Sequence, residues 1–289
     1  MKGMVRILNF FEINENASDQ ENIISAPYDV YIPLMREKYE QIKLGRYDKT
    51  EYPENFPQQY RTGRGIAYFS EMVYEAFRGG LFNQFIVEGQ QGAGKSSFAL
   101  WVARAIYGNW HDALKHVVID PFQLRQIILV AEANSITIPL IVVDDAGLFF
   151  SKGLAYRRQT GRMQTIQRLL QVIRTAVSNI ILTTPNEEEL SGIVIRQPKQ
   201  YKIIIEKQNE LVSKARVYEE EIQPLRGKKI TRRLKLRDDI EKNLRTPLDF
   251  LEVAQNAHEV NLPRHIDDTA YQIYMKLRGL YTAIALRTS

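Results

Sequence analysis

The stretch Gly89–Ser96 reads GQQGAGKS and decides the fold class of this chain. It has the G-x-x-x-x-G-K-S spacing of a phosphate-binding loop, and the strand-like run Phe85–Val87 precedes it. A helical pattern follows from Ser96 to Ile106, so the motif lies between the strand and the helix that its chemistry requires. Glycines let the backbone curl around a phosphate, and the helix adds the positive end of its dipole. The stretch therefore predicts a nucleotide-binding protein.

The chemistry of the loop indicates ATP and Mg²⁺ as its cofactors. Lys95 would reach the β- and γ-phosphates, and the Ser96 hydroxyl would ligate a magnesium ion that bridges the same phosphates. The residues expected to line the nucleotide are Gly89, Gln90, Gln91, Gly92, Ala93, Gly94, Lys95, Ser96 and Ser97.

The composition is that of a globular protein and excludes several kinds of site. Hydrophobic residues make up 44% of the 289 positions and charged residues 25%. No apolar run approaches the length of a membrane span, and the N-terminus lacks a signal peptide, so we expect a cytoplasmic protein without a membrane partner. The absence of cysteine excludes disulfides, thiolate metal sites and a cysteine nucleophile. The histidines are scattered, which disfavours a metal other than magnesium.

Apolar runs alternate with helical patterns along the middle of the chain. After the loop helix, strands are expected at 117–120, 139–143, 179–184 and 201–205. This alternation predicts an α/β fold of the P-loop NTPase class, with a mostly parallel five-stranded sheet and helices on both faces. The run Ala215–Ile222 predicts one more strand, which could pair with the fifth in a hairpin.

The sequence pattern divides the chain into three segments. Residues 1–63 are expected to form an irregular N-terminal extension. Residues 64–223 would form the P-loop ATPase core, beginning with a helix that stops at Gly79-Gly80. Residues 224–289 would form a small, basic and mainly helical C-terminal module.

Two acids, Asp144 and Asp145, end the strongest apolar strand of the chain. An acid in this place, the Walker B position, would hold magnesium, and we assign that role to Asp144. Asp145 is our candidate for orienting or deprotonating the attacking water. The alternative is that one of the two acids caps a following turn.

In its order of strands and motifs the chain resembles the additional-strand, catalytic-acid division of P-loop ATPases, and the AAA+ proteins within it. The strand at 117–120 stands between the loop helix and the Walker B strand, and ILTTPN is similar to the family's sensor strand. The resemblance implies that Thr184, or alternatively Thr183, contacts the attacking water. It also implies that Arg196 is an arginine finger acting on a neighbouring subunit, and hence a homo-oligomer. A threonine packed in the sheet and a solvated arginine are the alternatives.

The chain departs from that family in two respects. Its catalytic acid is aspartate where glutamate is usual, and Arg226 and Arg264 are only unsupported choices for a second sensor on a helical lid. The VVDDAG stretch, the IILTTP strand and the basic segment before the C-terminal end are similar to P-loop ATPases of archaeal viruses and plasmids. Those ATPases are compared with replication initiators and helicase loaders.

The stretch Arg226–Arg237 carries seven basic residues in twelve positions and no acid. Such a stretch fits regularly spaced phosphates and predicts a nucleic-acid partner, most simply DNA; a solvated linker is the alternative. Arg157, Arg158 and Arg162 form a smaller basic cluster that could contact nucleic acid or a neighbouring subunit.

Three functions fit these features. The first is an oligomeric ATPase that acts on nucleic acid in replication, remodelling or packaging. The second is a nucleotide-dependent switch or loader that hydrolyses ATP slowly and acts on protein partners. The third is a kinase, which the second acid and the additional strand disfavour.

Overall fold

The computed structural model describes residues 27–150, 172–186, 190, 199–222, 229–234 and 259–288. Within these residues eight strands form one sheet in the order β2-β3-β4-β1-β5-β6-β7, with β8 paired to β6. The strands are β1 Asn83–Glu88, β2 Val117–Val118, β3 Ile141–Val143, β4 Asn179–Thr184, β5 Lys199–Lys207, β6 Val212–Ile222, β7 Lys229–Arg233 and β8 Glu259–Pro263.

The sheet is mixed, so the predicted five-stranded, mostly parallel sheet is wrong in extent. The five expected strands do pair in parallel, from β2 through β5. Strand β6 then runs antiparallel to β5, and β7 and β8 pair antiparallel to its two ends. A short connection after Lys207 permits only a hairpin return, because a parallel crossover needs a dozen or more residues.

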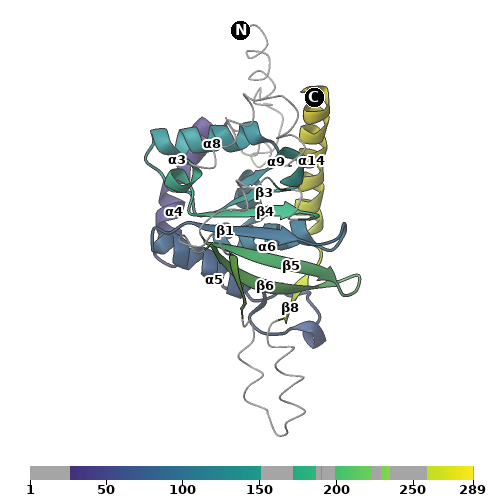
Figure 1. Ribbon diagram of the computed structural model, residues 1–289. Helices are drawn as coiled ribbons and strands as arrows, with labels where there is room; N and C mark the ends of the chain where they lie inside the picture. The colour runs from purple at the N-terminus through teal and green to yellow at the C-terminus, as the bar shows by residue number, and fades with distance from the viewer. Residues whose placement is uncertain are drawn as a thin grey trace.

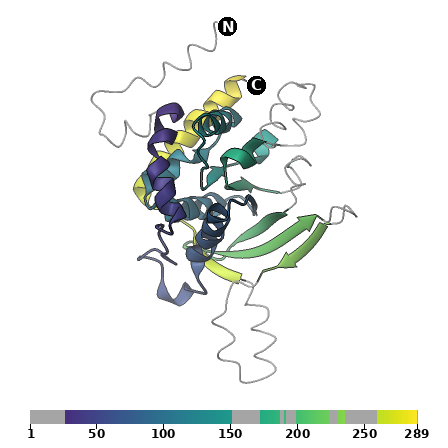
Figure 2. The ribbon, with the colours of Figure 1, turned by 90° about the vertical axis from the view of Figure 1, so that its left-hand side faces the viewer.

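Helices lie on both sides of this sheet, as expected (Figure 2). Helices α5 and α6 pack against each other, and α3 packs against α8. In the part of the chain described, every helix is too short or too polar to span a lipid bilayer. The helices are α3 Tyr28–Leu34, α4 Arg36–Lys43, the 3-10 turn η2 Gln58–Tyr60, α5 Gly65–Arg78, α6 Lys95–Tyr107, α7 Trp110–Lys115, α8 Pro121–Ala133, α9 Gly147–Phe150 and α14 Asp268–Thr288.

Strand β4 lies between β1 and β3 and sets the position of the site. It pairs in parallel with both neighbours, with Glu88 opposite Thr184 and Val143 opposite Leu182. All three strands are buried along their length except for the last residue of β1. Their carboxyl ends therefore meet at one edge, where the phosphate-binding loop follows β1 and the two acids follow β3.

The N-terminal segment is not irregular over Tyr28–Lys43, where it forms α3 and α4. Tyr31, Ile32, Tyr39 and Ile42 are buried in the same hydrophobic core as the sheet. The prediction of an irregular extension is wrong for this part, and the division of the chain at residue 63 stays a prediction.

The C-terminal segment also differs from a separate helical module. Strands β7 and β8 belong to the main sheet, and Val260 and Leu262 are buried in its core. Helix α14 follows and stands at the side of the sheet toward which β4 points, in yellow in Figure 1. The residues beyond 223 that are described thus complete the α/β fold.

The buried side chain of His116 links α4 to α7 through hydrogen bonds. The carbonyl oxygen of Asp112 lies 2.6 Å from His116 Nδ1, and the Tyr39 hydroxyl lies 2.6 Å from His116 Nε2. A carbonyl only accepts, so Nδ1 carries the proton and Nε2 accepts from Tyr39. His116 is thus fully bonded as the neutral imidazole, and complete burial lowers the pKa of His116 from 6.5 to about 4.

We expect the protein to lose about 3 kcal/mol of folding stability between pH 6.5 and pH 4 on account of His116. The unfolded chain binds a proton below pH 6.5, whereas the folded chain resists it until about pH 4, so stability is present above this window and lost as pH falls through it. Urea unfolding of the wild type and of His116→Gln at a series of pH values measures the difference.

The same titration of His265→Gln is the control, because His265 is exposed. An identical pH slope in wild type and His116→Gln would show that the loss has another origin.

Candidate functional site

The loop between β1 and α6 has the close packing that its glycines permit. A Cβ at Gly89 would collide with the carbonyl oxygen of Ile205 on β5. Gly94 has φ +97°, and a Cβ there would lie 2.8 Å from Ser213 Oγ on β6. Ser213 also donates to the carbonyl of Ala93 at 2.6 Å. Strands β5 and β6 therefore brace the outside of the loop, which leaves glycine as the residue that fits.

Lys95 lies inside the loop. Its Nζ donates to the carbonyl oxygens of Gly89 at 2.8 Å and Gln90 at 3.0 Å, and the residue is 8% exposed. Burial lowers the pKa of Lys95, while the carboxylates of Asp145 and Asp144 oppose that shift. The ammonium group is thus held by neutral acceptors that a more strongly charged phosphate oxygen could replace.

Asp144 is the centre of a hydroxyl cluster. It is 1% exposed, and its Oδ1 accepts from Ser96 Oγ at 2.8 Å and Thr183 Oγ1 at 2.7 Å. Its Oδ2 accepts from the hydroxyl of Tyr274 on α14. The two residues expected to hold magnesium, Ser96 and Asp144, are therefore in direct contact.

Asp145 adopts φ +50°, in the left-handed region that aspartate tolerates better than most residues. Its N–H donates to Thr183 Oγ1 at 2.9 Å, and its carboxylate forms an ion pair with Arg278 on α14. Burial and the neighbouring Asp144 raise the pKa of Asp145, and Arg278 opposes the shift. Asp145 is thus placed beside the loop lysine, with its charge balanced from the C-terminal helix.

The oxygen-rich pair of Ser96 and Asp144 suits a hard cation such as Mg²⁺, which prefers oxygen ligands. Among the residues described, no group of three or more His, Cys, Asp or Glu side chains forms a metal cage. A magnesium ion here would therefore complete its coordination with phosphate oxygens and water, as nucleotide-bound magnesium does.

Strand β4, the predicted sensor strand, brings Thr183 rather than Thr184 to the acids. Thr183 bonds both Asp144 and the backbone of Asp145. The Thr184 hydroxyl instead donates to the carbonyl of Asn186 at 3.0 Å. The alternative residue of the sequence-based prediction is thus the one in the acid cluster. Arg196 and the cluster of Arg157, Arg158 and Arg162 lie outside the described residues.

The basic stretch 226–237 is described only from Lys229 to Leu234, where it forms β7 and not a helix or linker. Its register places Arg232 opposite Glu219 of β6. Cross-strand neighbours of opposite charge attract each other. Glu219 therefore offsets part of the charge of Arg232, which remains exposed.

Tyr274, Arg278 and Arg264 are site residues that sequence reasoning missed or left open. Arg264 Nε donates to the carbonyl of Gly92 at 3.0 Å, and its Nη1 pairs with the Glu210 carboxylate at 2.8 Å, so Arg264 braces the loop from outside. Tyr274 and Arg278 are separated by one helical turn, and this four-residue spacing was the sequence feature that could have shown that they face the same site. The same spacing also occurs in ordinary helix packing, so it does not identify them.

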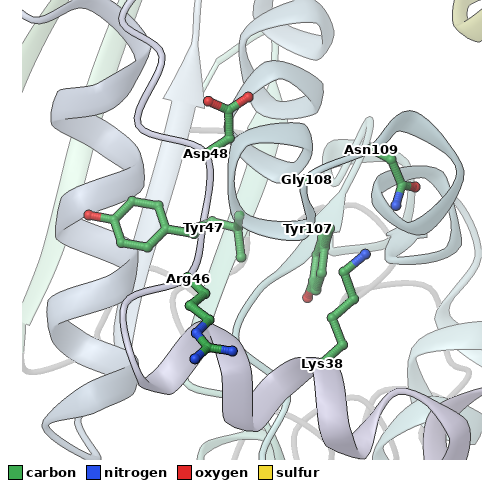
Figure 3. Close-up of a pocket in the computed structure, with 8 residues that line it drawn as sticks. Lys38, Arg46, Tyr47, Asp48, Tyr107, Gly108 and Asn109 are labelled. Atoms are coloured by element: carbon green, nitrogen blue, oxygen red, sulfur yellow. The ribbon is translucent and has the colours of Figure 1, made fainter.

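A shallow pocket of about 240 Å³ lies at the other end of α6, away from the phosphate-binding loop (Figure 3). Gly108, just beyond the C-terminal end of α6, lines it, whereas the loop precedes the N-terminal end of the same helix. Its other lining residues are Lys38, Arg46, Tyr47, Asp48, Ile106, Tyr107 and Asn109. This pocket does not contain the acids or Lys95, so it is separate from the candidate nucleotide site.

Comparison with known proteins gives a viral relative. No protein-family model matches the chain. The uncharacterized protein B-251 of Sulfolobus spindle-shape virus 1 is 32% identical over 132 residues, which is 43% of this chain and 51% of that protein. The chain thus spans about half the length of this relative. The expected similarity to proteins of archaeal viruses is confirmed, and the AAA+ subtype is not shown.

Among solved structures, the KaiC-like protein PH0186 of Pyrococcus horikoshii OT3 aligns with 65% of this chain and 99% of its own, at 15% identity and a TM-score of 0.31. So low a score carries no argument about function. The candidate site is therefore defined by the geometry of the loop, the acids and α14.

Proposed function

We propose that this chain binds ATP with Mg²⁺ at the carboxyl edge of its parallel strands and hydrolyses it. The observation that carries the proposal is the convergence of the phosphate-binding loop, Lys95, Ser96 and both acids at one edge. Ser96 Oγ lies 2.8 Å from Asp144 Oδ1, and Lys95 is held between the loop carbonyls. When bound, magnesium would neutralise phosphate charge, with Ser96 and Asp144 as its protein ligands.

The residues of the chain would then act in three ways. The Lys95 ammonium would turn from the carbonyls of Gly89 and Gln90 to phosphate oxygens, which are stronger acceptors because they are charged. Asp145 would orient the attacking water and accept its proton, which requires its carboxylate to separate from Arg278. Thr183 links Asp145 to Asp144 and would keep the two acids in fixed relation.

We also propose that the ATPase is of the AAA+ type and works as an oligomer, with Arg196 acting on a neighbouring subunit. Support comes from the strand order, in which β4 separates β1 from β3, together with the resemblance of the motifs. The position of Thr183 in the acid cluster makes it the better sensor candidate than Thr184.

Nucleic acid is the proposed partner, with the basic stretch 226–237 as its contact. Strand β7 is last in the strand order and carries the exposed Arg232, which leaves it accessible to a polyanion. Because Glu219 offsets part of the charge of Arg232, we expect moderate affinity that falls with salt.

A nucleotide-dependent switch is the second candidate, favoured by the ion pair between Asp145 and Arg278. The carboxylate is held by the guanidinium and must separate from it before it can orient a water molecule. Slow hydrolysis without a partner would follow from this contact.

ATP turnover with and without DNA at low salt tests the proposal and separates the two candidates. We expect magnesium-dependent phosphate release that DNA stimulates. Replacing Arg232 with Gln should weaken stimulation and reduce the slope of log affinity against log salt by about 1, as loss of one phosphate contact does. Arg78→Gln, at the exposed end of α5, is the control.

The outcomes are distinct. Hydrolysis without any response to single- or double-stranded DNA would reject the nucleic-acid role and leave the switch. Absence of magnesium-dependent ATP binding would reject both.

A further inference from the structure

Helix α14 reaches both acids of the candidate site with one face. Tyr274 contacts Asp144, and Arg278, one turn later, contacts Asp145. Tyr274 is 3% exposed, so its hydroxyl is directed into the protein and not toward solvent. One helix thus supplies a neutral donor to the first acid and a cation to the second.

The start of α14 is anchored independently of these contacts. Strand β8, just before it, pairs with β6. Arg264 donates to the loop carbonyl of Gly92, and Trp101 Nε1 on α6 donates to the carbonyl of His265 at 2.8 Å. These bonds fix the helix origin beside the phosphate-binding loop, so the reach of Tyr274 to Asp144 is set by the fold.

The oxygens of Asp144 are divided between different donors. Ser96 and Thr183 both donate to Oδ1, and Tyr274 donates to Oδ2. Tyr274 also forms a side-chain hydrogen bond with Ser96, so its hydroxyl contacts both residues that would hold a metal. It fixes Oδ2 of Asp144, while Oδ1 faces Ser96.

We propose that Tyr274 is a positioning residue for the magnesium ligand Asp144. Its hydroxyl fixes Oδ2 and with it the orientation of the carboxylate, whose Oδ1 faces Ser96. Since Asp144 is 1% exposed, loss of this donor would remove a hydrogen bond from a buried carboxylate oxygen. The inference rests on the proposed magnesium-dependent ATP binding. If Tyr274 instead competes with the metal, removing its hydroxyl should strengthen magnesium-dependent ATP binding and not weaken it.

The test is Tyr274→Phe, which keeps the ring and removes the hydroxyl. Binding of a fluorescent ATP analogue is titrated with MgCl₂, and binding without magnesium is measured in EDTA. We expect the magnesium concentration at half-saturation to rise about tenfold, the usual effect of losing a hydrogen bond to a charged group. Affinity in EDTA should not change. Tyr271→Phe is the matched control, because Tyr271 lies on the same helix and is 45% exposed.

Three results would overturn the inference. A lower half-saturation in Tyr274→Phe would show competition with the metal. An unchanged half-saturation, with or without a fall in melting temperature, would show that the hydroxyl serves only packing. Magnesium-independent or absent ATP binding in the wild type would reject the proposed function itself, and the wild-type titration identifies that case before any variant is compared.

Discussion

Lys95→Ala is expected to reduce ATP binding and turnover by about a hundredfold to a thousandfold, as removal of a charged donor from a phosphate site does. The lysine is 8% exposed, and its ammonium lies among loop carbonyls where no solvent cation can replace it. Alanine would leave the phosphate charge without its nearest protein cation. Equilibrium binding of a fluorescent ATP analogue, with phosphate release measured on the same samples, checks the prediction.

Lys115→Ala provides a matched control, because Lys115 is also a buried lysine, at 6% exposure, on α7. Both substitutions remove a desolvated ammonium and can change stability, but only Lys95 contacts the loop. Equal losses of ATP binding in the two variants would mean that the effect is structural and that Lys95 has no direct role.

Asp145→Asn is expected to keep ATP binding and to lower hydrolysis by about a hundredfold or more, the size of effect typical of a missing general base. The amide has nearly the same shape but cannot accept the proton of water. The substitution also removes the charge that pairs with Arg278. Single-turnover phosphate release, compared with nucleotide affinity, separates chemistry from binding.

Asp144→Asn is the companion variant, since it changes the neighbouring acid by the same one-atom replacement. Asp144→Asn should weaken magnesium-dependent ATP binding more than it slows the hydrolysis step, because Asp144 contacts Ser96 and Asp145 does not. If Asp145→Asn hydrolyses ATP at the wild-type rate, the water-activating residue is misassigned.

How much of the fold could be predicted depends on how far apart in the sequence the interacting residues lie. Strands built on apolar runs, such as Ile141–Val143 and the Ile180–Leu182 part of β4, were predicted because strands buried on both faces have such runs. The hairpin of β5 and β6 was also foreseen, since the two runs are close in sequence. Strand β8 was not, because its polar–apolar alternation covers only Glu259–Leu262 and it pairs with Val212–Arg216 across more than forty residues.

The N-terminal helices were missed for a different reason. Apolar residues recur at helical spacing from Tyr31 to Ile42. However, Pro33 lies inside α3, and α3 ends and α4 begins on either side of Met35. Each helix is too short to be stable alone. Their formation depends on the core against which they pack, and this dependence is invisible in a local pattern.

The sequence by itself determined the phosphate-binding loop, its lysine and the acids after the third strand, because strand, loop and helix are adjacent and their geometry is local. Only the tertiary structure decided that Thr183 joins the acids and that Tyr274 contacts Asp144, a residue 130 positions away. The pairing of β4 between β1 and β3 and the anchoring of β8 on β6 create these contacts. Contacts of this kind depend on where whole elements pack, and no spacing of residues along the chain encodes them.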